Sequence, residues 1–134
     1  MILSVKTRSQ TELVDITDSV RKWIQSLGFV SGLCFLYVPH TTAAVTINES
    51  ADPSVALDIV TALNRMVPPQ GPYRHLEGNS PAHIKASMIG SSVLVAVEQG
   101  ELCFGTWQGI FFCEFDGPRT RKVRIRFLQA DFKE

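Results

Sequence analysis

A strict alternation of side-chain types near the end of the chain constrains the fold most. Between Lys122 and Phe127, cationic and apolar side chains alternate along the backbone. Successive side chains of a β-strand point to opposite faces, so this pattern predicts a strand with one apolar face. The cationic members are Lys122, Arg124 and Arg126, and the apolar members are Val123, Ile125 and Phe127.

The cationic face of this predicted strand has two interpretations. Arg119 and Arg121 lie just before it, so five of the 13 basic residues fall within eight positions. Such a row is typical of a solvated outer face or a subunit contact. It also fits a phosphate-binding patch, because the guanidinium fork matches phosphate oxygens bidentately.

Three segments show the periodicity or the end signals of helices. Apolar residues spaced by three and four predict a helix over residues 15–28, and Pro53 at a first helical position predicts one over 53–66. A shorter helix is predicted over 81–89. The predicted N-caps are Thr17, Asp52 and Ser80, and Gly28 and Gly90 end the first and third helices.

The remaining ordered segments are predicted strands. The continuous apolar run at 32–38 indicates a strand buried on both faces. The order ββ, helix, ββ, helix, βββ excludes a regular βαβ repeat and predicts an α+β fold. We expect a single domain over residues 1–134, built as an antiparallel-rich β-sandwich with two to three helices. The predicted strands are 2–7, 32–38, 43–49, 92–97, 102–114 and 121–129.

Composition excludes several classes of protein. The chain has 134 residues, of which 45% are hydrophobic, and its 13 basic and 13 acidic side chains give no net charge. A protein without a basic excess is not expected to bind nucleic acid, and no apolar run approaches the roughly 20 residues of a membrane helix. We therefore expect neither nucleic-acid nor membrane partners.

Three cysteines, Cys34, Cys103 and Cys113, form an odd set without CxxC spacing. Their apolar neighbours predict small buried side chains in a reducing compartment, with a thiol nucleophile as the alternative. We expect a cytoplasmic protein.

The three histidines, His40, His75 and His83, are the candidate reactive groups. Each lies in a loop or at the end of a predicted element, where functional sites are usually built. None shows the HxxxH or HExxH spacing that places two metal ligands on one helical face. From the residues alone, two interpretations of the histidines stay open. They could be hydrogen-bonded surface residues, or they could belong to one site.

Two further groups have alternative interpretations. Asp52 is predicted to cap the helix that begins at Pro53, while Glu49 just before it could act as a general base or a metal ligand. The glycines around Trp107 and Gln108 indicate a bulge or a close backbone approach. Trp107 could equally be an ordinary core residue.

The chain resembles the YjbQ-like family, also called secondary thiamine-phosphate synthase enzymes, at three motifs. The first runs from His40 to Pro53. The second combines residues 75–79 with 82–87, and the third combines 105–110 with 114–119. Together they span the chain from His40 to Arg119 in the order of the family.

The resemblance implies an α+β homotrimer whose histidines and acids share a pocket. It implies a small-molecule enzyme that holds a divalent metal and acts on a phosphorylated metabolite, with thiamine-phosphate synthase activity in some members. Imidazole ligands favour zinc or another transition metal over magnesium. A non-catalytic trimeric binding or regulatory module is the alternative. The implied metal ligands are His40, His75 and His83, the catalytic residues are Glu49, Asp52 and Glu77, and the substrate-binding residues are Lys85, Ser87, Trp107, Gln108 and Arg119.

Overall fold

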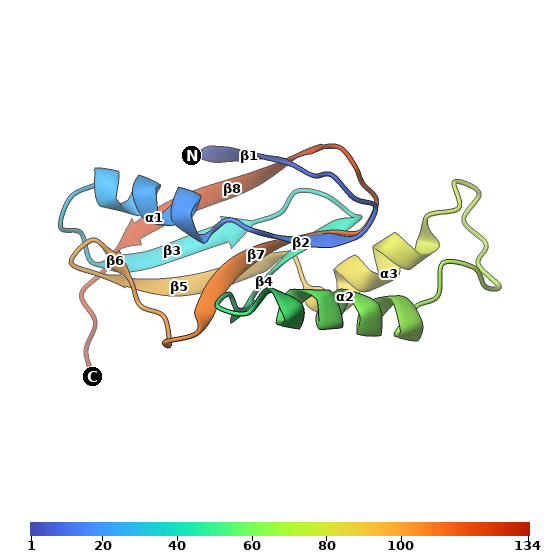
Figure 1. Ribbon diagram of the computed structural model, residues 1–134. Helices are drawn as coiled ribbons and strands as arrows, with labels where there is room; N and C mark the ends of the chain where they lie inside the picture. The colour runs from blue at the N-terminus through green and yellow to red at the C-terminus, as the bar shows by residue number, and fades with distance from the viewer.

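Two antiparallel sheets stack face to face in the computed structural model, which describes residues 1–134 (Figure 1). The larger sheet has the strand order β1-β8-β3-β5-β6, and the smaller one has the order β2-β7-β4. The expected α+β sandwich is confirmed. The strands are β1 (Ile2–Lys6), β2 (Glu12–Asp15), β3 (Gly32–Tyr37), β4 (Ala43–Glu49), β5 (Ser92–Glu98), β6 (Glu101–Leu102), β7 (Gln108–Glu114) and β8 (Thr120–Gln129).

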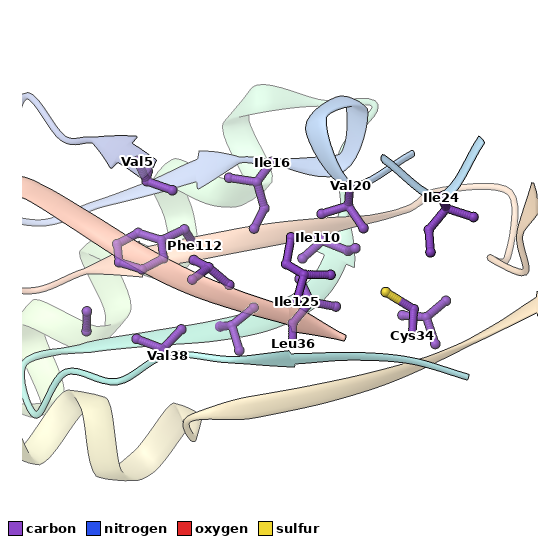
Figure 2. Packing of buried hydrophobic residues seen from close by; sticks show 14 of the residues in the cluster. Val5, Ile16, Val20, Ile24, Cys34, Leu36, Val38, Ile110, Phe112 and Ile125 are labelled. Atoms are coloured by element: carbon purple, nitrogen blue, oxygen red, sulfur yellow. The ribbon is translucent and has the colours of Figure 1, made fainter. Parts of the chain in front are cut away.

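The main core fills the space between the two sheets (Figure 2). Fifteen buried side chains form it, and they are apolar throughout. Leu36 and Ile125 come from the larger sheet, Ile110 and Phe112 from β7 of the smaller one. Burial of this apolar surface is the main stabilising contribution to the sandwich.

Three helices pack against the sheets: α1 (Thr17–Ser26), α2 (Pro53–Met66) and α3 (Ser80–Ile89). The helix α1 packs its buried Val20 and Ile24 into the main core. In contrast, α2 and α3 lie together at the other side of the smaller sheet (Figure 1). A second core of six buried residues joins them to it, including Leu63, Ala86 and Cys113. None of the three helices has the length and apolarity that crossing a membrane requires.

The helix ends confirm part of the prediction. The Asp52 carboxylate accepts the Ser54 N–H at 2.9 Å and caps α2 as expected. Thr17 is not the cap of α1, because Ile16 holds that position and the Thr17 hydroxyl accepts the Ile110 N–H at 2.9 Å instead. Ser80 is likewise the first residue of α3 and not its cap, which is Asn79.

Two strand predictions are wrong. The predicted strand 102–114 is two strands, because β6 ends at Leu102 and β7 begins at Gln108 in the other sheet. The strand β3 is not buried on both faces, since Phe35 is 38% and Tyr37 is 41% exposed. Both side chains lie on the outer face of the larger sheet, which no other element of the chain covers. The strand β2 was not among the predicted ranges, although the predicted order placed two strands before the first helix.

Smaller differences follow from local surroundings. Cys34 and Cys113 are buried as predicted, but Cys103 is exposed because it follows the short edge strand β6. The expected close backbone approach occurs at Gly109, where a Cβ atom would lie 2.7 Å from the Cβ of Ser50. Only glycine fits that position without displacing a neighbour.

Candidate functional site

The helix α3 carries candidate residues on two of its sides. His83 and Ser87 are four residues apart, which places them on the same side of a helix. Both line an open cleft. Lys85 points away from that cleft into a separate hollow, which it shares with Glu77.

The open cleft brings two of the three histidines together, and we call it the histidine cleft. His40 enters it from the loop after β3, and His83 enters from α3, although 43 positions separate them. The cleft measures about 530 Å³. Its lining residues are His40, Thr41, Ala43, His83, Ala86, Ser87, Gly90 and Ser91.

The hydrogen bonding of His40 defines its protonation. The Lys122 N–H donates to Nε2 of His40 at 3.0 Å, so the neutral ring carries its proton on Nδ1. Burial lowers the pKa of His40, and the positive charge of Arg121 lowers it further. His40 is therefore neutral near pH 7, and its Nδ1–H is the remaining hydrogen-bond donor.

The rings of His75 and His83 lie in contact with each other. Their ring centroids are 5.3 Å apart in an edge-to-face arrangement, and Glu77 Oε2 lies 3.9 Å from Nε2 of His75. His40 is not the third member, because its Nε2 lone pair already accepts the Lys122 N–H. No three histidine, cysteine or acidic side chains converge closely enough to hold a metal within this chain. The residues of one chain thus do not complete the three-histidine metal site that the resemblance implies.

A buried ion pair next to His40 was missed by the sequence analysis. Arg121 on β8 binds the carboxylate of Glu114 on β7, with an Nη2–Oε2 distance of 2.5 Å, and the Thr7 hydroxyl donates to the same carboxylate at 2.7 Å. Arg121 therefore points inward, unlike the other cations of the last strand. The signal was present in the sequence, because Arg121 shares its strand face with Val123 and Ile125.

The remaining predicted cations are placed differently. Arg119 is half exposed and pairs with Asp116 at 3.2 Å, while its charge also lowers the pKa of His40. Lys122, Arg124 and Arg126 are exposed, as the alternation predicts. The Ser87 hydroxyl donates to the carbonyl of His83 at 2.9 Å, so it is occupied within its own helix.

Comparison with known proteins places this architecture in one family. The family model described as UPF0047 protein YjbQ-like matches residues 1–130. The chain belongs to this YjbQ-like family. Protein YugU of Bacillus subtilis is 48% identical over 127 residues, which cover 94% of this chain and 96% of that protein. Protein MJ1081 of Methanocaldococcus jannaschii is also 48% identical, over 92% and 90% of the two chains.

Solved structures of relatives share the fold. A conserved YjbQ/UPF0047 family protein from Clostridium acetobutylicum superposes with a TM-score of 0.93 at 48% identity, covering 96% of this chain and 99% of that chain. The hypothetical protein APE1520 from Aeropyrum pernix superposes with a TM-score of 0.92 at 41% identity, covering 97% and 98%. The family resemblance and its fold are therefore confirmed.

In this YjbQ-like chain, four of the predicted site residues lie away from the histidines. Glu49 ends β4 whereas His40 precedes it, and the seven residues of that strand span about 20 Å. Asp52 is occupied as a helix cap, and Trp107 is 61% exposed. Gln108 accepts the Gly105 N–H at 2.8 Å through its side-chain oxygen. These four residues gather at the far end of the smaller sheet, and the chain does not bring them to the histidine cleft.

Proposed function

We propose that this protein is an enzyme that acts on a small phosphorylated metabolite in the histidine cleft. The observation that carries the proposal is the placement of His40 and His83, from two distant segments, around the same cleft. An imidazole at the wall of a cleft is suited to general acid–base chemistry near pH 7. The Lys122 N–H fixes the tautomer and the orientation of His40, so its Nδ1–H can donate a hydrogen bond to a substrate in the cleft, while His83 is the imidazole that would transfer the proton.

The resemblance seen in the sequence motifs extends the proposal to thiamine-phosphate synthesis as a secondary reaction. That reaction joins a pyrimidine diphosphate to a thiazole phosphate and releases pyrophosphate, so it needs positive charge at the leaving group. Arg119 is half exposed and its charge is felt at His40, so it is the arginine that we propose to contact an anionic group. Purified protein with Mg²⁺ and both precursors should then form thiamine phosphate, and no product above a heat-inactivated control would exclude this extension.

We also propose that a divalent metal, when bound, would sit at His75 and His83, where His83 would act as a ligand instead of as the acid–base group. Imidazole ligands favour zinc or another transition metal over magnesium, which prefers oxygen ligands. A third ligand must then come from a second chain or from the substrate. Elemental analysis should show metal loss in His75→Ala and His83→Ala but retention in His40→Ala, because His40 has no free Nε2 lone pair. Equal occupancy in all three variants would contradict this assignment.

The outer face of the larger sheet supports the expected homotrimer. The run 32–38 is apolar on both faces, yet Phe35 and Tyr37 are exposed in the single chain. Leu94, which pairs with Phe35 across β3 and β5, is exposed beside them. A second copy of the chain would bury this row and satisfy the two-sided apolar pattern. Light scattering that gives the mass of a single chain would refute the trimer.

The main proposal is tested by turnover together with binding. A set of phosphorylated metabolites is incubated with the full chain, and products are measured by mass spectrometry. We expect turnover of one of them, with a loss of at least tenfold in His83→Gln because a general acid–base group contributes on the order of a hundredfold or more. His40→Gln should also lose turnover, because it removes the Nδ1–H donor from the cleft wall. Ser91→Ala, which changes the cleft wall without removing an imidazole, is the matched control. Full turnover in both histidine variants would overturn the proposal.

A non-catalytic binding module is the second candidate, and two observations favour it. No carboxylate lines the histidine cleft to pair with the imidazoles, and the Ser87 hydroxyl is occupied within α3. A binding module should be stabilised by its ligand without consuming it. A ligand that raises the melting temperature and is recovered unchanged would favour this candidate over the enzyme.

A further inference from the structure

A second hollow lies on the other side of α3 from the histidine cleft, and we call it the lysine pocket. It measures about 390 Å³, within the range of roughly 300–1,000 Å³ that is usual for small-molecule sites. It lies between α2, α3, the turn after β7 and the segment before β2, and its walls are mostly polar. The side chains that matter for binding are Asn64, Glu77, Asn79, Lys85 and Asp116.

Lys85 is a buried cation without an anionic partner. Its residue is only 4% exposed, and no carboxylate oxygen lies within 4.0 Å of its ammonium group. The ammonium group donates to the Asn64 side-chain oxygen and lies 5.9 Å from the centre of the Phe115 ring. Buried lysines are normally paired with an acid, since desolvation of an ammonium ion is costly. The same burial lowers the pKa of Lys85.

Asn79 adds an unsatisfied acceptor at the same pocket. Its Nδ2 donates to Asp116 Oδ2 at 2.9 Å, which orients the amide. Its Oδ1 is buried and has no hydrogen-bond partner, the single such side-chain atom in the chain. Buried polar groups are rarely left unpaired, so each exception calls for an explanation. A donor from a bound molecule would satisfy Oδ1.

Together, these two groups define what the pocket would recognise. We infer that the lysine pocket binds a small metabolite that presents an anionic group to Lys85 and a hydroxyl or amino donor to Asn79 Oδ1. This inference does not depend on the reaction proposed for the histidine cleft, because the two hollows share no lining residue.

The acids around the pocket set its selectivity. Asp116 lines the wall, and Glu77 lines it with a side chain that is 75% exposed. A simple anion would meet these negative charges as well as Lys85. A molecule that carries a donor beside its anionic group satisfies Asn79 and can also donate to the acids. We therefore expect glycerol 3-phosphate or glycerate to bind more tightly than inorganic phosphate, and glycerol not to bind.

Calorimetric titration of the full chain with these four probes tests the inference. Loss of the charged hydrogen bond in Lys85→Met should weaken binding of the preferred probe by about tenfold or more, since a charged hydrogen bond contributes about 1.5–3 kcal/mol. Asn79→Ala should remove the preference over inorganic phosphate while leaving phosphate binding in place. Lys22→Met removes an exposed lysine on α1 and is the matched control, with unchanged binding.

The outcomes separate this inference from the proposed function. Unchanged affinity in Lys85→Met, or binding of none of the four probes, would overturn it. If Lys85→Met does not fold, Lys85→Gln retains a polar head near Asn64 and takes its place. Binding that is lost in His83→Gln and retained in the Lys85 variants would place the ligand in the histidine cleft and would also overturn the inference. Binding that persists in His83→Gln while turnover is lost supports both proposals.

Discussion

The turn after β7 separates two arginine–carboxylate pairs that share their chemistry but not their surroundings. Glu114 and Arg121 meet between the sheets, where their side chains are 0% and 3% exposed. Asp116 and Arg119 meet at the surface, where the corresponding values are 24% and 50%. The first pair joins β7 of the smaller sheet to β8 of the larger one, whereas the second lies within a single turn.

The difference shows that the buried pair has a structural role, whereas the exposed pair is available to a ligand. The buried pair is fully satisfied, because Thr7 donates to Glu114 and Arg121 donates to the Thr42 hydroxyl at 2.8 Å. Neither side chain can reach a ligand. The surface pair leaves Arg119 accessible and orients Asp116 toward Asn79 in the lysine pocket. Thus the inner pair holds the sheets in register, and the outer pair shapes the pocket wall.

Arg121→Met should produce the largest effect. It leaves Glu114 buried without its counter-charge, which typically lowers the free energy of unfolding by about 3–5 kcal/mol. Urea denaturation followed by circular dichroism measures this loss. The double variant Glu114→Gln/Arg121→Met should recover most of it, because no unpaired charge remains. A single variant within about 1 kcal/mol of the wild type would show that the buried pair does not hold the sheets together.

Acid should weaken the protein through the same carboxylate. Burial raises the pKa of Glu114, but hydrogen bonds from Arg121, Thr7 and the Asp116 N–H outweigh it, so the pKa lies below the usual 4.5. A lowered folded-state pKa gives stability that is present above pH 4.5 and is lost as the pH falls through the folded value. Urea denaturation at a series of pH values should show this loss in the wild type. The double variant should show a shallower decline, and equal slopes would assign the acid sensitivity to other groups.

The pKa of His40 should respond to the charge of the buried Arg121. Arg121 lowers the pKa of His40 more than Glu114 raises it, so the double variant should titrate at a higher pH than the wild type. Nuclear magnetic resonance of the imidazole protons measures this shift directly. Arg119→Met should also move this pKa upward, but by less than Arg121→Met alone, since the charge of Arg121 lowers the pKa of His40 more than that of Arg119 does. A larger shift in Arg119→Met than in Arg121→Met would reverse the order of the two arginines.

Arg119→Met should have the smallest effect on stability. Exposed ion pairs contribute about 0–1 kcal/mol, because water screens the charges and the long side chains lose freedom when they pair. The same urea denaturation should give a change within that range. A loss comparable to that of Arg121→Met would remove the distinction between the two pairs.

The pattern of apolar, charged and capping residues along the chain predicted much of the fold. The alternation along β8 and the Asp52 cap of α2 were predicted because each depends on residues close together in the chain. The division of the predicted strand 102–114 into β6 and β7 was not predicted. Both segments contain apolar residues, and what separates them is that they belong to different sheets. The candidate site was predicted less well. Glu49 lies in the same motif as His40, but an extended strand carries the two apart.

The motifs already indicate the family, and the pattern of residues already gives most of the order of the elements and the face on which most side chains lie. The order and the faces follow from periods of two and 3.6 residues, which are properties of the local backbone. What lies opposite each face became visible only in the folded chain. The stacking of two sheets joined Glu114 to Arg121, and the packing of α3 against the smaller sheet buried Lys85 while turning His83 toward His40. Such contacts depend on how separate elements pack, and local patterns along the chain do not encode that packing directly.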